Sequence, residues 1–140
     1  MNTPPVASDA DGPSPQDGHP RVDPVPTSAA AARSHVTDLL RTAGIDLDSI
    51  TAADVLLVTS ELVTNAIRHG GGLTTFHTEI VDGVLHLSVG DADPQPPVPR
   101  TGSVERPGGY GWPLVHNLSE STRVERHPHG KTIATFLRLT

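Results

Sequence analysis

The chain has 140 residues, a net charge of −6 and no cysteine. This length suits a single domain, and the absence of cysteine excludes disulfides and thiolate zinc sites. The negative charge provides no broad basic field for holding phosphate backbones, so we expect no direct contact with nucleic acid.

Residues 1–26 hold seven of the fourteen prolines and few large apolar side chains. Such a segment cannot bury enough surface to offset the entropy of ordering, so we expect a disordered, acidic, proline-rich tail ahead of one domain over residues 27–140. The segment lacks the basic start and apolar core of a signal peptide. No run approaches the ~20 apolar residues of a membrane span, so we expect a cytoplasmic protein without membrane contact.

Two helices are predicted at the start of the domain. Thr27 or Ser28 can cap a helix that runs to about residue 43, with Gly44 as its C-terminal stop. A second helix, capped by a polar side chain among residues 48–51, is expected to reach residue 69, where three consecutive glycines end it.

A hairpin is predicted next. Residues 74–81 and 84–89 are rich in β-branched side chains, and Asp82-Gly83 between them suits a type I′ turn. The second strand delivers Asp91 at its end.

Residues 92–107 contain five prolines, which exclude regular helix and sheet. A loop of about sixteen residues is more often a lid or a binding loop than a plain connection. A helix over residues 112–118 and strands over 121–127 and 131–139 complete the chain. This order predicts an α+β fold: a two-layer sandwich in which one mixed, mostly antiparallel sheet carries helices on one face.

The most informative pair is Glu61 and Asn65, four residues apart on the second predicted helix. At roughly 100° per residue the two side chains point within about 40° of each other, beside an apolar arc. Magnesium keeps several of its waters, so one amide oxygen from Asn65 suffices as its protein ligand, and Glu61 remains free to handle protons. The alternative interpretation of this pair is a solvated helix face.

Two further features suit a nucleotide. Asp91 is an acceptor for the exocyclic amine that distinguishes adenine from guanine, although an Asp after a strand can also be a turn or cap residue. Gly108, Gly109 and Gly111 precede a helix whose N-terminus offers free N–H groups and partial positive charge to phosphates. The alternative for this cluster is a plain turn.

Four motifs in chain order resemble those of the ATP-binding superfamily of gyrase, MutL and the sensor histidine kinases. They are Ser60-Glu-Leu-Val-Thr-Asn-Ala-Ile-Arg-His-Gly70, Asp91, the glycine cluster and Gly130-Lys131-Thr132. The first of these is most similar to the small bacterial anti-sigma-factor serine/threonine kinases. The resemblance covers about residues 27–140. It implies a histidine-kinase-like ATPase fold with ATP and Mg²⁺ as cofactors, covered by the proline-rich loop as a lid.

The resemblance also implies residue roles. Arg106, just ahead of the glycine cluster, would contact the terminal phosphate, although a lone loop arginine can also be a solvated surface charge. Thr132 would touch the phosphate region from the sheet. His69 would either reach the phosphates or complete the helix end. Lys131, the only lysine, is expected to be exposed.

One motif departs from the family pattern. The family's first glycine motif runs Asp, any residue, Gly, any residue, Gly, whereas this chain reads Asp91-Ala-Asp-Pro-Gln95, so both glycines are missing.

The first functional hypothesis is therefore a protein kinase that phosphorylates an anti-anti-sigma factor and also sequesters a sigma factor. Glu61 would act as general base, Asn65 would hold magnesium and Arg106 would neutralise developing charge. The second hypothesis, which the lost glycines favour, is a nucleotide-dependent binding module without transferase activity. A histidine kinase is disfavoured because no helix with a phosphoacceptor histidine precedes the domain, and a homodimer is left open.

Overall fold

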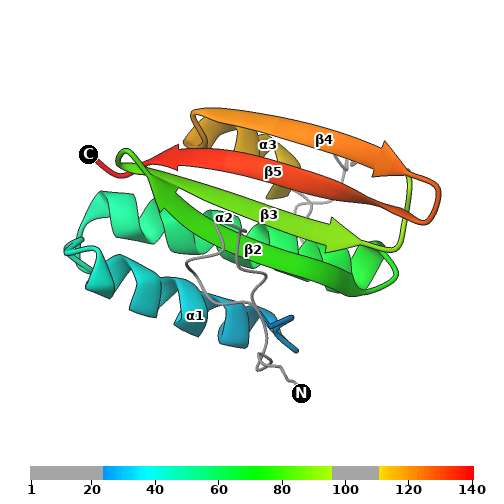
Figure 1. Cartoon of the computed structure of the whole chain (residues 1–140), viewed down its shortest axis with the longest axis horizontal. Helices are drawn as coiled ribbons and strands as arrows, with labels where there is room; N and C mark the ends of the chain where they lie inside the picture. Colours follow the sequence, from blue (N-terminus) through cyan, green and yellow to red (C-terminus); the bar gives the residue numbers. More distant parts are fainter. Residues whose placement is uncertain (1–23, 96–110) are drawn as a thin grey trace, which may run out of the picture.

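The computed structural model describes residues 24–95 and 111–140, drawn in colour in Figure 1. Most of the expected tail and most of the proline-rich loop lie outside these residues. Within them the chain forms three helices and four strands. The helices are α1 (Ala29–Thr42), α2 (Ile50–His69) and α3 (Gly111–Leu118), and the strands are β2 (Leu73–Val81), β3 (Val84–Asp91), β4 (Ser121–His127) and β5 (Gly130–Arg138).

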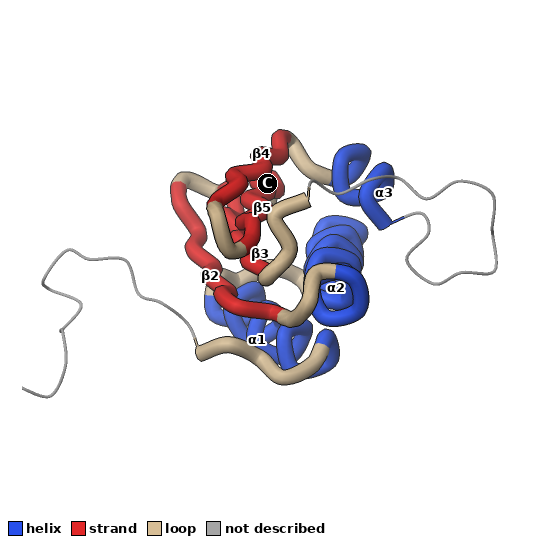
Figure 2. The backbone as a smooth tube through the Cα atoms, turned by 90° about the vertical axis from the view of Figure 1, so that its right-hand side faces the viewer, coloured by secondary structure: helices blue, strands red, loops and turns tan. Residues whose placement is uncertain are grey.

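The four strands form one sheet in the order β2-β3-β5-β4, and each neighbouring pair is antiparallel. The three helices lie on one side of this sheet, as Figure 2 shows. The predicted α+β sandwich is therefore confirmed. The part of the chain that the structure describes contains only antiparallel pairings, whereas a mixed sheet was expected.

Both long helices begin at the kind of cap that the sequence predicts. The Ser28 hydroxyl accepts a hydrogen bond from the Ala31 N–H, and the Ser49 hydroxyl accepts one from the Ala52 N–H. Each bond satisfies a backbone donor that the first helical turn leaves free. At the other end of α1, Gly44 has φ +80°, the left-handed conformation that glycine adopts readily.

The β2–β3 hairpin turns at Asp82 and Gly83, whose φ angles of 52° and 77° are both positive, as a type I′ turn requires. The hairpin aligns the two strands up to the pairing of Leu73 with Asp91. Strand β3 is therefore two residues longer than expected, and Asp91 is part of it.

The hydrophobic core fills the space between the helices and the sheet. Every second residue of β3 and β5 points toward it, so the strands bury one face and leave the other more exposed. Fully buried apolar residues of both long helices complete it. Examples from the sheet and helices are Phe76, Leu85, Leu87, Val36, Leu40, Val58 and Leu62.

Helix α2 occupies the centre of the helical layer. By length and composition alone it is apolar enough to cross a bilayer, contrary to the sequence expectation. In this fold, however, it packs against α1, α3 and the sheet, and its buried side chains belong to the core. The apolar character of α2 is accounted for by this packing.

Replacing Leu62 by alanine should lower the free energy of unfolding by about 2–5 kcal/mol, because the side chain is 1% exposed and its removal leaves a cavity. Leu57, on the same helix and 40% exposed, is the matched control. Its replacement by alanine should change stability by about 1 kcal/mol or less. Urea unfolding measures both, and equal losses would contradict the placement of the core.

Candidate nucleotide site

Asp91 and Lys131 face each other at one end of the sheet. Antiparallel pairing places the last residue of β3 opposite the second residue of β5, so the register aligns Asp91 with Lys131. Both residues lie on the helix-facing side of their strands, and they are 6% and 5% exposed. Forty residues of sequence therefore separate two charges that share one buried position.

The two side chains form a buried ion pair. The Lys131 Nζ atom lies 3.0 Å from Asp91 Oδ2 and 3.2 Å from Asp91 Oδ1, and both side chains are 7% exposed. The same ammonium donates a hydrogen bond of 3.0 Å to the carbonyl oxygen of Asp93. The expectation that Lys131 is exposed is wrong, because strand alternation directs it inward, where the carboxylate compensates its charge.

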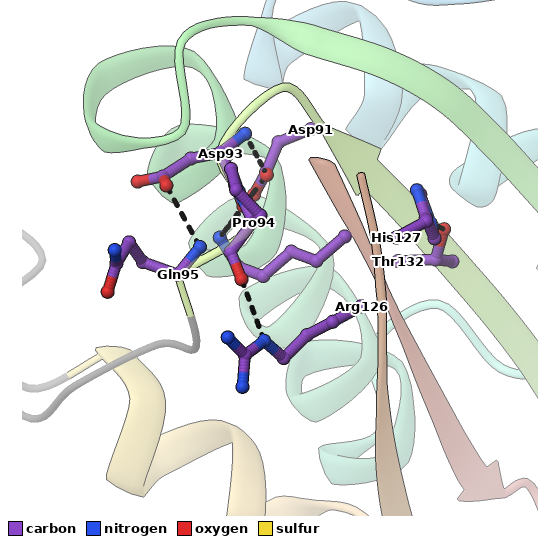
Figure 3. Close-up of polar contacts among 8 residues, drawn as sticks. Asp91, Asp93, Pro94, Gln95, Arg126, His127 and Thr132 are labelled. Atoms are coloured by element: carbon purple, nitrogen blue, oxygen red, sulfur yellow. Dashed lines mark hydrogen bonds and ion pairs between the residues drawn. The ribbon is translucent and has the colours of Figure 1, made fainter. Parts of the chain in front are cut away.

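The residues after Asp91 form a turn held by side chains. The Asp93 N–H donates to Asp91 Oδ1 at 2.9 Å, and the Gln95 N–H donates to Asp93 Oδ1 at 3.0 Å. From β4, the edge strand on the other side of β5, the Arg126 Nε–H donates to the Pro94 carbonyl at 3.0 Å, as Figure 3 shows. Carboxylate and guanidinium groups thus fix the backbone at the place where the family motif has glycines.

Two glycines allow other segments to approach Asp91 closely. A Cβ atom on Gly70, at the end of α2, would lie 2.6 Å from the Asp91 carboxyl carbon, and one on Gly130 would lie 2.0 Å from the Asp91 carbonyl oxygen. The Ala92 N–H also donates to the Gly70 carbonyl at 2.9 Å. The end of α2, the end of β3 and the start of β5 therefore meet at Asp91.

Helix α2 carries the other predicted pair toward this end of the fold. Glu61 and Asn65 are both half-buried and lie one helical turn apart. The Glu61 Oε1 atom is buried, and it has no hydrogen-bond partner among the residues that the structure describes. A buried acceptor normally has a partner, so this oxygen is a candidate contact for a bound group. His69 is exposed at the last position of the helix.

The structure does not bring Thr132 to Asp91. Thr132 follows Lys131 on β5, and successive side chains of a strand point to opposite faces. Its hydroxyl lies 3.2 Å from His127 Nε2 at an exposed position on the outer face of the sheet. Figure 3 shows both residues on the far side of the strands from Asp91. Lys131 is the residue of this motif that reaches the candidate site.

The glycine cluster is only partly visible. Arg106, Gly108 and Gly109 lie outside the described residues, and Gly111 is the first residue of α3. Helix α3 packs against α2 and contributes the buried Val115 to the core. The roles of these residues stay predictions.

Sequence reasoning did not assign roles in the site to Lys131 and Gly130. One signal was the position of Gly130-Lys131 at the start of a predicted strand. If that strand paired antiparallel with the strand that ends at Asp91, the lysine would lie opposite the aspartate. Using it required the strand order, which places β5 rather than β4 beside β3.

Comparison with known protein families shows which class of domain this chain is. The family model of the histidine kinase-like ATPase domain matches residues 22–136, so the chain belongs to this family. Membership makes it a domain of the ATPase and kinase type and implies ATP binding. A comparison with curated protein sequences gave no match.

Histidine kinases are among the solved structures that match this chain. The histidine kinase domain of the blue-light activated histidine kinase EL346 from Erythrobacter litoralis is 24% identical, with a TM-score of 0.47 over 64% of this chain and 45% of that chain. The Acinetobacter baumannii histidine kinase AdeS is 16% identical, with a TM-score of 0.48 over 89% of this chain and 72% of that chain. This chain thus spans less than half of the Erythrobacter domain.

Replacing Gly130 by alanine should destabilise the fold by about 3 kcal/mol or more, because the new methyl group would meet backbone that no rotamer change can move aside. Gly44→Ala is the control. That glycine has a positive φ and open surroundings, so its replacement should cost only about 1–2 kcal/mol of backbone strain. If urea unfolding gave a smaller loss for Gly130→Ala than for Gly44→Ala, the close approach at Asp91 would be wrong.

Proposed function

We propose that this domain is an ATP-dependent serine/threonine protein kinase of the anti-sigma type, and that its substrate is an anti-anti-sigma factor. Family membership supports ATP use. The observation that carries the proposal is the buried Glu61 Oε1 atom without a partner among the described residues, one turn from Asn65. A carboxylate in this setting is suited to accept a proton.

The side chains of α2 fit a magnesium nucleotide. Asn65 offers one amide oxygen, the hard ligand type that magnesium accepts while it keeps several waters. Glu61 adds an acceptor that the described residues leave unsatisfied. When bound, ATP would supply the γ-phosphoryl group, and magnesium would neutralise part of the negative charge of the phosphates.

In the proposed reaction, the hydroxyl oxygen of a serine or threonine on the partner forms a bond to the γ-phosphorus, and the bond to the bridging β,γ oxygen breaks. ADP leaves, and the hydroxyl proton passes to Glu61. Arg106 would stabilise charge on the transferring group, and His69, Gly108, Gly109 and Gly111 would bind the phosphates. Asp91 would accept a hydrogen bond from the exocyclic amine of adenine.

The proposal includes a cellular setting. The kinase acts in the cytoplasm, where it phosphorylates the anti-anti-sigma factor and also sequesters a sigma factor, either as a monomer or as a homodimer. It contacts neither nucleic acid nor membrane directly. These partners follow from the resemblance of residues 60–70 to the anti-sigma-factor kinases.

One observation favours a second candidate function, a nucleotide-dependent binding module. The Asp91 carboxylate is already engaged by Lys131, and the turn after it replaces the family's glycine motif. Weak nucleotide binding through such a site would suit regulation of a partner without rapid phosphoryl transfer.

Replacing Glu61 by glutamine separates the two functions. The variant should still bind magnesium-ATP and the partner, but phosphoryl transfer should fall by about 10²–10⁴-fold, the range for a general base. The assay incubates the pure protein with magnesium-ATP and each anti-anti-sigma candidate of the same genome, and mass spectrometry detects phosphoserine or phosphothreonine. Glu79→Gln, which changes an exposed carboxylate on β2, should transfer at the unmodified rate.

Transfer by Glu61→Gln at the unmodified rate would remove Glu61 from the chemistry. Absence of phosphorylation by the unmodified protein, together with nucleotide-dependent partner affinity, would establish the binding module instead.

Replacing Asn65 by alanine should affect only the magnesium-dependent part of nucleotide binding. In magnesium we expect ATP affinity to fall by about 10-fold, because one ligand or hydrogen bond to a charged group is lost. In EDTA we expect ATP affinity to stay unchanged. Asn117→Ala, at an exposed position on α3, serves as control. Isothermal titration in both buffers tests this, and an equal loss in EDTA would show that Asn65 does not act through the metal.

A further inference from the structure

Among the described residues, the polar contacts of the Lys131 ammonium group are all made with Asp91 and the turn that follows it. An ammonium has three donors and no acceptor. Its neighbours are Asp91 Oδ2 at 3.0 Å, Asp91 Oδ1 at 3.2 Å and the Asp93 carbonyl oxygen at 3.0 Å. Asp91 Oδ1 also accepts the Asp93 N–H. The carboxylate that would read the base therefore already holds a cation supplied by the chain itself.

Building on the nucleotide site proposed above, we infer that Lys131 occupies the acceptor that Asp91 offers to the amino group of a purine. Nucleotide binding then competes with the Asp91–Lys131 ion pair. Lys131 is thereby the residue that sets the affinity of the site and its selectivity for the base.

The competition is unequal for electrostatic reasons. The amino group of adenine is a neutral donor, whereas the ammonium carries a full charge, and its attraction to a carboxylate is strongest where water is excluded. With both side chains 7% exposed, little solvent screens the pair. A neutral base alone is a weak competitor for this acceptor.

The surroundings keep the carboxylate where Lys131 can reach it. Gly70 and Gly130 leave no space for side chains beside Asp91, so the residue is held by backbone on two sides. The ammonium also binds the Asp93 carbonyl, which ties the turn after β3 to β5. Displacing Lys131 therefore frees the base acceptor and removes one of the contacts that hold this turn.

Lys131→Met tests the inference, with Arg126→Met as the matched control. Both substitutions remove a cation that donates to a carbonyl of the same turn, but only the first frees Asp91. Isothermal titration with magnesium-ATP and magnesium-GTP measures the affinities. Lys131→Met should bind ATP at least about 10-fold more tightly than the unmodified protein, the effect expected for one charge-assisted hydrogen bond. Arg126→Met should bind both nucleotides like the unmodified protein.

Base selectivity gives a second readout from the same titrations. Guanine presents a carbonyl oxygen where adenine presents its amine, and a free carboxylate repels it. The unmodified protein should bind ATP and GTP about equally, whereas Lys131→Met should prefer ATP by about 10-fold or more.

A second variant covers the case in which Lys131→Met does not fold, since it leaves a buried carboxylate without its partner. Asp91→Asn with Lys131→Met removes both charges. If Lys131 already engages the carboxylate, the double variant should bind ATP at least as tightly as the unmodified protein. If Asp91 instead reads the base directly in the unmodified protein, ATP affinity should fall by about 10-fold or more.

The outcomes separate this inference from the proposed function. Equal ATP affinity and equal selectivity in the unmodified protein and Lys131→Met would overturn the role of Lys131 and leave the nucleotide site standing. If Lys131→Met binds ATP and the unmodified protein does not, the result supports the inference. Absence of nucleotide binding in every folded variant would overturn both.

Discussion

The buried ion pair between Asp91 and Lys131 joins the end of β3 to the start of β5, and the end of α2 and the turn after β3 also meet at it. Helix α2 ends against Asp91 at Gly70, and β5 begins against it at Gly130. The same two side chains hold the first part of the turn after β3, through hydrogen bonds to Asp93. Burying two charges is expensive, and well-packed apolar residues often give equal or greater stability. A pair kept at the end of the sheet, rather than an apolar contact, is therefore more readily explained by function than by stability.

The fold separates the parts of the site among elements that the core holds rigidly. Helix α2 carries Glu61 and Asn65 on the same arc, and its buried face fixes their direction. Strand β3 presents Asp91 at the sheet end near the last turn of that helix. Membership in the histidine kinase-like ATPase family implies that this arrangement binds ATP. The Glu61 oxygen, which has no partner in the part of the chain that the structure describes, favours phosphoryl transfer, and the ion pair at Asp91 favours control of nucleotide binding.

Local signals made much of the fold predictable. Ser28 and Ser49 as caps, Asp82-Gly83 as a turn and the periodicity of the apolar residues each depend on a few neighbouring residues, and the structure confirms them. The burial of Lys131 and the outward direction of Thr132 were not predictable in this way. Both depend on which strand lies beside β3 and on its register, and these are set by packing of the whole sheet. The sequence shows that the glycines after Asp91 are missing, but it does not show that a turn held by the Asp91 and Asp93 carboxylates takes their place.

Lys131 is the only lysine of the chain, so its side-chain ammonium gives a single assignable signal in a ¹H–¹⁵N spectrum. Without nucleotide, the buried ion pair should slow exchange with water and make this signal observable. Saturation with magnesium-ATP should shift it or broaden it away, because the base displaces the ammonium from Asp91. An ammonium signal that stays unchanged while ATP is bound would contradict the competition between Lys131 and the nucleotide.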